Sequence, residues 1–213
     1  MRKSLRLALL VVFFVGIFSA QVFSAEEELV PRGQYNLADY QKLSGKEIAS
    51  FSEAPQLVEL VEQGELPPVE ERIPQNPAVV EPVEEIGEYG GTWRRYGHLD
   101  WATYGYILYE PLVRWSSDLV TVEPNIAEEW RISEDGKTFT FYIRKGIRWS
   151  DGEPFTADDI MFWYEDIILN EELTPVPLSW MVAGGEIAKF KKIDDYTVEI
   201  SFPVPYGLFL HEL

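Results

Sequence analysis

The stretch WSDGEPFTADDI, residues 149–160, concentrates carboxylates that could carry acid–base chemistry. Such chemistry needs carboxyl groups in a cleft with pKa values set apart by their surroundings. The same residues also fit a helix start, because Thr156 precedes Asp159 by three positions and an apolar helical pattern begins at Ile160. The threonine would accept a hydrogen bond from the first turn, and Asp158 and Asp159 would lie at the positive end of the helix dipole. We therefore interpret the stretch as a turn and a helix cap, and predict no enzyme activity from it.

The rest of the sequence lacks other common catalytic patterns. It contains two histidines, His98 and His211, and no cysteine, and neither a GxSxG nor an HExxH motif is present. The glycines of GEYGGTW, residues 87–93, do not follow the spacing of a phosphate-binding loop and precede a strand-like segment at 91–96. No catalytic residue, metal site or cofactor is predicted.

Residues 98–104 form an aromatic cluster that follows this predicted strand. Loops after strands often contact ligands, and tryptophan and tyrosine rings can stack on a sugar or on a peptide side chain. His98, Trp101 and Tyr104 are therefore the candidate ligand-binding residues. The alternative is that Trp101 and Tyr104 pack inside the domain.

Two hairpins and one helix must position these groups. Residues 129–133 and 138–145 flank the turn sequence Glu-Asp-Gly-Lys, and apolar residues alternate in the second segment. Residues 187–193 and 196–202 repeat this arrangement around two aspartates. Between the hairpins, residues 156–170 carry apolar side chains at helical spacing. Hairpins combined with helices predict an α+β domain.

The first 25 residues have the pattern of a secretory signal peptide. Three basic residues precede the 12-residue apolar run 7–18, which small residues and then three glutamates follow. The run is shorter than the ~20 residues that span a membrane, although an uncleaved anchor is the alternative. Export predicts a periplasmic or extracellular protein, and the sequence has no cysteine that could carry a lipid anchor.

The remaining sequence divides into two parts. Residues 26–86 form an N-terminal extension with short helical patterns, one of them beginning at a potential Asn36 cap and another after Ser52. Five prolines between positions 67 and 82 predict an extended linker over a surface. Residues 87–213 form the second part. Because the chain stops in an apolar run directly after a strand, we expect an incomplete domain from a longer protein.

The second part resembles the family 5 extracellular solute-binding proteins, the peptide-, nickel- and oligosaccharide-binding components of ABC importers. The resemblance lies in YEPLVRW at 109–115 and in EPNIAEEWRISEDGKTFTFYIRKGIRWSDGEPFTADDIMFWYED at 123–166, and it extends weakly over 87–213. It implies an α+β or α/β fold, namely the N-terminal portion of a type II periplasmic-binding-protein lobe. Members close two lobes around a ligand, so part of one lobe is not expected to enclose a ligand alone.

The resemblance implies the substrate-binding component of an importer of oligopeptides or oligosaccharides, with ABC permease subunits as partners. Without positions 1–25 the chain carries 15 Lys and Arg against 36 Asp and Glu, a formal charge of −21. This charge disfavours nucleic acid and anionic membrane surfaces as partners. It would suit cationic ligands, or it forms a solvated acidic surface. The alternative functions are a fragment of a secreted carbohydrate-active enzyme and a non-catalytic surface module.

Overall fold

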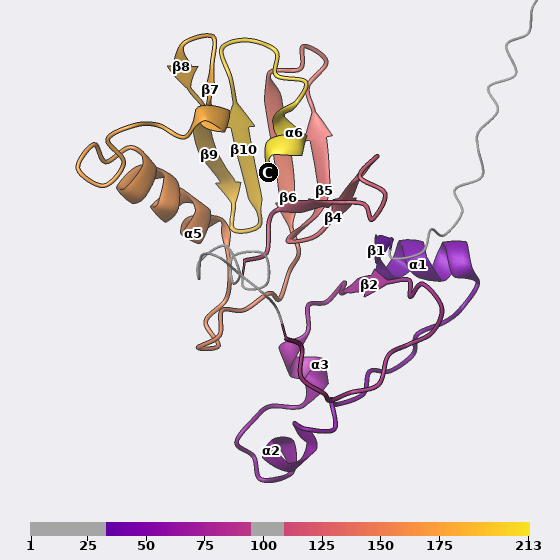
Figure 1. The fold of residues 1–213 in the computed structure, drawn as a ribbon. Helices are drawn as coiled ribbons and strands as arrows, with labels where there is room; N and C mark the ends of the chain where they lie inside the picture. The colour runs from indigo at the N-terminus through magenta and orange to yellow at the C-terminus, as the bar shows by residue number, and fades with distance from the viewer. Residues whose placement is uncertain (1–32, 95–108) are drawn as a thin grey trace, which may run out of the picture.

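The computed structural model describes residues 33–94 and 109–213, and a four-stranded antiparallel sheet forms their centre (Figure 1). Its strands are ordered β5 (Ala127–Ile132), β6 (Thr138–Ile143), β10 (Thr197–Ser201) and β9 (Lys189–Asp194). The β5–β6 and β9–β10 pairs are the two predicted hairpins, which are confirmed. The sheet joins them through β6 and β10.

Alternation along the strands gives the sheet one apolar and one polar face. Phe141 lies opposite Val198 and Phe139 opposite Ile200, and all four side chains are buried. The intervening positions of β6 and β10 carry threonine, tyrosine, glutamate and serine. Because successive side chains of a strand point to opposite faces, this pattern requires a cover on one face only.

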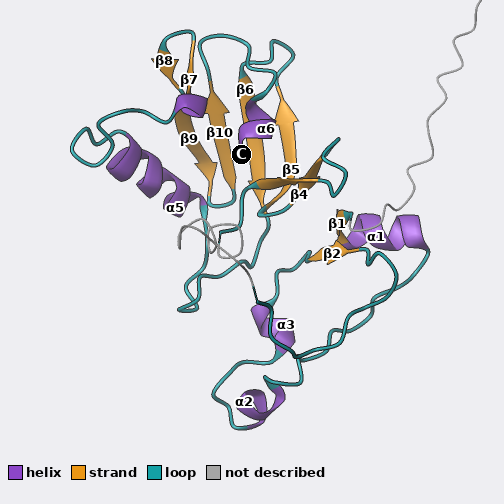
Figure 2. Ribbon diagram, viewed as in Figure 1, coloured by secondary structure: helices purple, strands orange, loops and turns teal. Residues whose placement is uncertain are grey.

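A helix covers the apolar face beside β9 and β10 (Figure 2). It begins as α5 (Ala157–Phe162) and continues as a π-helical segment (Trp163–Ile168). The side chains of Ile160, Tyr164 and Ile168 are buried as the apolar spacing predicts. The Tyr164 ring stacks on Phe190 of β9 with centroids 4.5 Å apart, and its hydroxyl donates to the Ala188 carbonyl at 2.9 Å.

Phe209 closes the other end of this core. It begins the short helix α6 (Phe209–Glu212), and its ring lies 4.8 Å from the rings of Phe139 and Phe202, both edge-on. The side chain is completely buried. Edge-to-face contacts add to the apolar burial of such rings, so the last residues of the chain belong to the same core as the sheet.

Smaller elements surround this core. Three-residue strands form the β3–β4 pair, and two-residue strands form the β7–β8 pair. A short 3-10 helix precedes β7. Their bounds are β3 (Val113–Trp115), β4 (Val122–Pro124), the 3-10 helix (Ser179–Met181), β7 (Val182–Ala183) and β8 (Glu186–Ile187).

The N-terminal part packs beside the sheet domain, at the lower right of Figure 1. Strands β1 (Gln34–Asn36) and β2 (Ala78–Val80) pair antiparallel, and the chain between them forms a long loop with three short helices. These helices are α1 (Leu37–Ser44), α2 (Val58–Glu62) and α3 (Val69–Arg72). The proline-rich stretch thus contains one helix and one strand besides its extended residues.

Polar contacts join this N-terminal part to the sheet domain. The Gln34 amide donates to the Pro124 carbonyl at 2.7 Å and accepts from Arg114 at 3.0 Å. The buried Arg144 guanidinium donates to the carbonyl oxygens of Asn76 and Asn125. The N-terminal part is therefore held against the sheet domain at two places along the chain.

Gly146 permits the second of these contacts. Its φ of +95° favours glycine, and a Cβ atom there would lie 3.2 Å from the Pro74 Cα. The backbones consequently approach closely enough for the Gln75 N–H to donate to the Lys145 carbonyl at 3.0 Å. The proline-rich stretch crosses the sheet domain at this glycine.

Three local predictions differ from the structure in part. Asn36 occupies the N-cap position of α1, but its side-chain amide donates to the Glu128 carbonyl at 2.9 Å and does not cap the helix. The helix expected after Ser52 begins only at Val58. Residues 91–94, the described part of the strand predicted at 91–96, are not in a strand, and residues 95 and 96 lie outside the described residues. At Asn36 a distant contact thus overrides the local cap.

Candidate functional site

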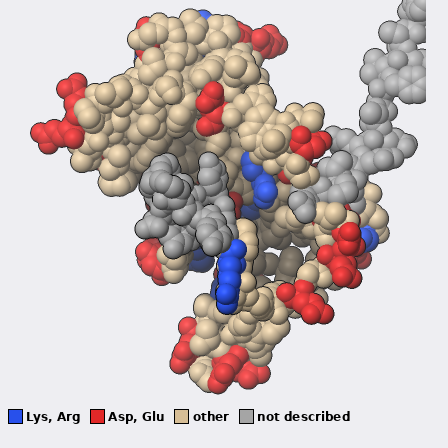
Figure 3. All heavy atoms as spheres, in the orientation of Figure 1, with Lys and Arg blue, Asp and Glu red and all other residues tan. Residues whose placement is uncertain are grey.

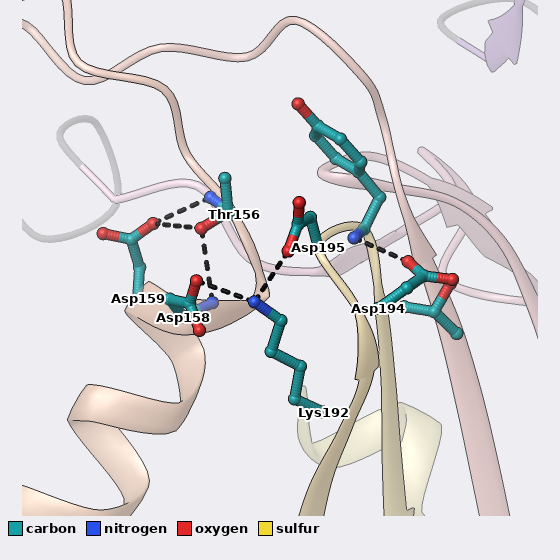
Figure 4. A network of polar contacts seen from close by, with 8 residues as sticks. Thr156, Asp158, Asp159, Lys192, Asp194 and Asp195 are labelled. Atoms are coloured by element: carbon teal, nitrogen blue, oxygen red, sulfur yellow. Dashed lines mark hydrogen bonds and ion pairs between the residues drawn. The ribbon is translucent and has the colours of Figure 1, made fainter.

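The carboxylates of WSDGEPFTADDI surround the start of α5, where they make local structural contacts (Figure 4). Thr156 is the N-cap residue, and the Asp159 carboxylate accepts from the Thr156 N–H at 2.7 Å. The Thr156 hydroxyl accepts from the Asp158 N–H at 3.3 Å. The predicted capping box is thus present. The preceding residues form the predicted turn, in which the Gly152 N–H donates to the Trp149 carbonyl at 2.9 Å.

Lys192 connects this helix start to the β9–β10 turn. Its ammonium group lies 2.7 Å from carboxylate oxygens of both Asp158 and Asp195. Hydrogen bonds to these two carboxylates raise the pKa of Lys192 above its ordinary value. Figure 4 shows the three side chains converging from α5, the turn and β9. One ammonium group is thus shared by two carboxylates, and the three groups together keep one negative charge.

The neighbouring carboxylates also carry structural hydrogen bonds. Asp194 accepts from the Tyr196 N–H at 2.8 Å and from the Thr197 hydroxyl at 3.0 Å, and these bonds lower its pKa. Asp159 also accepts from the Trp149 indole N–H at 3.1 Å. A general acid at neutral pH needs a raised pKa. This cluster has the geometry of a cap and a turn.

The raised carboxyl pKa in the described residues belongs to Glu123 of β4. Burial raises it, while a backbone hydrogen bond from Gln34 and the charge of Arg114 act in the opposite direction. Glu123 lies where the N-terminal part contacts the sheet domain. Its raised pKa therefore results from the packing of the two parts, and not from a paired acid–base site.

The sequence-predicted ligand-binding residues His98, Trp101 and Tyr104 lie outside the described residues. The described residues resume at position 109, and hydrogen bonds hold the residues that follow. The Asn125 amide donates to the Pro111 carbonyl and to the Glu110 carboxylate, each at 2.8 Å, and the Ala127 N–H donates to the Leu112 carbonyl at 2.8 Å. These bonds hold residues 110–112 against the sheet domain.

Sequence reasoning missed the buried polar contacts that fasten the N-terminal part. Asn76 donates to the Glu128 carboxylate at 2.8 Å, and Arg144 has one guanidinium nitrogen, Nη2, buried without a partner among the described residues. No local spacing connects positions 76 and 144, so the sequence carries no signal for this contact. Within residues 33–94 and 109–213 no group of three or more metal-ligating side chains occurs. In the same two ranges no helix has the length and apolar character of a membrane span.

Comparison with known proteins places these elements in a family. Residues 121–213 match the model for "Bacterial extracellular solute-binding proteins, family 5 Middle". A "Periplasmic alpha-galactoside-binding protein" of Rhizobium meliloti is 31% identical over 94% of the chain and 34% of its own length. A "Dipeptide-binding protein" of Escherichia coli is 34% identical over 50% of the chain and 22% of its own length.

Two solved structures resemble the fold. An "oligopeptide-binding protein OppA" is 41% identical over 85% of this chain and 29% of its own length, with a TM-score of 0.78. The periplasmic binding protein MelB of Agrobacterium fabrum C58, in complex with stachyose, is 32% identical over 82% of this chain and 29% of its own, with a TM-score of 0.60. The chain spans about a third of the length of these relatives.

The mixed helix-and-sheet fold is accordingly a partial lobe of a periplasmic binding protein. The strand–turn–helix junction around Thr156, the two hairpins and the closing α6 all fall within the stretch that the family model matches. Residues 121–213 therefore match the family 5 bacterial extracellular solute-binding proteins, and the α-galactoside-binding and oligopeptide-binding relatives are similar to this chain over most of its length.

Proposed function

We propose that the chain is the N-terminal portion of the substrate-binding component of an ABC importer, with an oligosaccharide or an oligopeptide as its ligand. One observation carries the choice of ligand class. The α-galactoside-binding relative, the stachyose complex and the oligopeptide-binding structure each align with more than four fifths of the chain, whereas the dipeptide-binding relative aligns with half. The longer matches extend into the N-terminal part, so that part is shared with binders of larger ligands.

The domain organisation follows from this function. Residues 1–25 would direct export and be removed, residues 26–86 would form the extension with its proline-rich linker, and residues 87–213 would form the beginning of the solute-binding domain. The protein would work in the periplasm, as its named α-galactoside-binding relative does. ABC permease subunits would receive the ligand.

We also propose that the chain is not an enzyme. Its matched family consists of binding proteins, and the carboxylates around Thr156 already serve a cap and an ion pair. No observation favours the alternative of a carbohydrate-active enzyme, which would need a carboxylate pair facing a cleft.

Isothermal titration calorimetry of the protein as its gene encodes it, including any sequence beyond residue 213, tests the ligand class. Stachyose and a set of tetrapeptides are titrated separately. We expect saturable binding to one of the two classes, and recovery of the injected ligand unchanged. Absence of binding to both, or cleavage of the ligand, would contradict the proposal.

A substitution of Trp101 tests the predicted ligand-binding residues in the same calorimetric titration. If Trp101 stacks on the ligand, Trp101→Ala lowers the affinity about tenfold, since an aromatic contact of about 1.4 kcal/mol corresponds to that factor. Trp149→Ala is the matched control, because Trp149 is half exposed beside α5 and its ring packs on Phe155. The control should leave the affinity unchanged. Equal losses in both variants would remove the special role of Trp101.

A further inference from the structure

The end of α5, its π-helical continuation and the loop after it carry exposed apolar side chains. We name this group the 162–178 patch, and its five side chains are between 38% and 76% exposed. They are Phe162, Leu169, Leu173, Val176 and Leu178. Exposed apolar residues that occur singly are ordinary, but a group of this size commonly marks a contact surface.

Internal bonds give the patch a defined shape. The Asn170 carbonyl accepts from the N–H groups of Leu173 and Thr174, and the Thr174 hydroxyl donates to the Ile167 carbonyl at 2.7 Å. The loop is thereby folded back onto the helix end. Its return is held by the Trp163 and Trp180 rings, which stack with centroids 6.2 Å apart. This stack brings the two ends of the patch, beside Trp163 and Trp180, close to one another.

The chain segment that carries the patch contains only negative charges. Residues 149–188 contain nine Asp and Glu and no Lys, Arg or His. The four acids interleaved with the patch are exposed, and in the described ranges none of them forms an ion pair: Glu165, Asp166, Glu171 and Glu172. Figure 3 shows acidic atoms at the left edge of the sheet domain, beside α5, without a basic neighbour there.

These charges decide between possible occupants. A second copy docking through the same surface would set four carboxylates against four, and like charges at an interface are unfavourable. An anionic membrane surface would be repelled for the same reason. A neutral apolar partner would strip water from the carboxylates without compensation. A basic segment with apolar side chains satisfies both the carboxylates and the exposed apolar groups.

We propose that the 162–178 patch is a docking surface for a cationic, amphipathic segment of a partner protein. The inference rests on the patch and its charges, independently of which ligand the protein carries. It implies binding that weakens with salt, because exposed charge pairs are screened over about 10 Å at 0.1 M ionic strength.

Cysteine labelling can test the surface, because the chain has no cysteine of its own. Val176→Cys and Val120→Cys each create one site, at positions 76% and 70% exposed, and the second lies outside the patch. The probe is a synthetic leucine–lysine amphipathic peptide of about 18 residues, and the control peptide replaces lysine by glutamate. Both are added to the protein as its gene encodes it, and the rate of maleimide labelling is measured.

We expect the leucine–lysine peptide to slow labelling at position 176 at least about fivefold and at position 120 less than about 1.5-fold, and raising the salt to about 0.5 M to remove the difference. The double variant Glu171→Gln with Glu172→Gln should weaken binding of the leucine–lysine peptide about threefold or more. The exposed pair Glu84→Gln with Glu85→Gln should leave this binding unchanged.

Four results would overturn the proposal. Equal protection of both cysteines would mean non-specific association of the peptide. Equal protection by the leucine–glutamate peptide would remove the role of charge. A cysteine at 176 that is unreactive before any peptide is added would mean that the protein's own chain covers the patch. A dimer, detected by light scattering and lost on Val176→Asp, would make the occupant a second copy.

Discussion

At the scale of single residues, the same chemical group serves different purposes according to its burial. Asp158 is exposed and shares Lys192 with Asp195, whereas Glu123 is buried against the N-terminal part. Hydrogen bonds hold the pKa of Asp194 below its ordinary value, while burial raises the pKa of Glu123. Such opposite shifts make opposite contributions to the pH dependence of stability.

Glu123→Gln should change this pH dependence in a defined direction. A raised pKa means that the folded protein binds the Glu123 proton more tightly than the unfolded chain does. Glu123 therefore lowers the free energy of unfolding as the pH rises from the ordinary value of 4.5 through the raised value. Replacing it with neutral Gln should remove that decline, so the variant should gain stability relative to the parent as the pH rises above 4.5.

Urea unfolding at several pH values provides the measurement. Glu129→Gln is the control, because Glu129 pairs with Arg131 on the exposed surface of β5, where an ion pair contributes about 0–1 kcal/mol. A variant at 123 whose stability relative to the parent does not change with pH would show that this carboxyl is not buried as the structure has it.

At the scale of elements, helix α5 with its π-helical continuation decides how the sheet is covered. The apolar spacing of residues 156–170 predicts the buried face, and the capping box sets where the helix begins. The change from α to π geometry at Trp163 is a tertiary feature, because it accompanies the packing of Tyr164 on Phe190 and of Trp163 on Trp180. Trp163 is only half buried as a result.

Two neighbouring substitutions distinguish the faces of this helix. Ile160→Ala should lower the free energy of unfolding by about 2–4 kcal/mol, because it removes buried methyl groups and leaves a cavity. Phe162→Ala, at a side chain 60% exposed, should cost less than about 1 kcal/mol. Chemical denaturation measures both. A larger loss at 162 than at 160 would mean that the helix is rotated from its described orientation.

At the scale of the whole molecule, the chain consists of a sheet domain and an N-terminal part that is fastened to it by buried polar groups. Gln34, Asn76 and Arg144 carry these contacts. A buried guanidinium that loses its acceptors is costly, and so are carbonyl groups that lose their donor. The position of the N-terminal part therefore depends on a few polar residues. The apolar side chains of α2 and α3 contribute little to it, because none of them is buried.

Arg144→Met should release the proline-rich stretch. The carbonyl groups of Asn76 and Asn125 lose their common donor, and we expect a loss of about 2–4 kcal/mol together with faster proteolysis between residues 67 and 82. Limited proteolysis followed by mass spectrometry locates the cuts. Arg148→Met is the control, because Arg148 is exposed and its guanidinium donates to the nearby Gly152 carbonyl. Unchanged cleavage in Arg144→Met would show that other contacts hold the stretch.

The second prediction at the scale of the whole molecule concerns export of the protein. When the protein is produced in a bacterium with a periplasm, we expect it there with a mature N-terminus at Glu26, because the segment 1–25 has the length and charge pattern of a cleaved signal. N-terminal sequencing of the periplasmic fraction measures this. A Leu9→Arg and Leu10→Arg double change in the apolar run should retain the precursor in the cytoplasm. A periplasmic protein that keeps residues 1–25 would indicate an uncleaved anchor.

The sequence alone determined the local elements and the family. Alternating side chains predicted both hairpins, the Thr156–Asp159 spacing predicted the cap, and the 123–166 pattern indicated the family that the comparison found. These features depend on residues within a few positions of one another, or on a motif that can be read directly along the chain. The assignment of the carboxylates to capping followed from the same local spacing.

Tertiary structure decided everything that joins distant positions. Asn36 bonds to Glu128 instead of capping its own helix, Gly146 admits the backbone of Pro74, and Arg144 reaches Asn76. These partners lie between 68 and 92 positions apart in the chain. Side-chain spacing carries no information over such separations. The folding of the chain brings these groups together, and the cost of burying a polar group without a partner then selects the contacts that form.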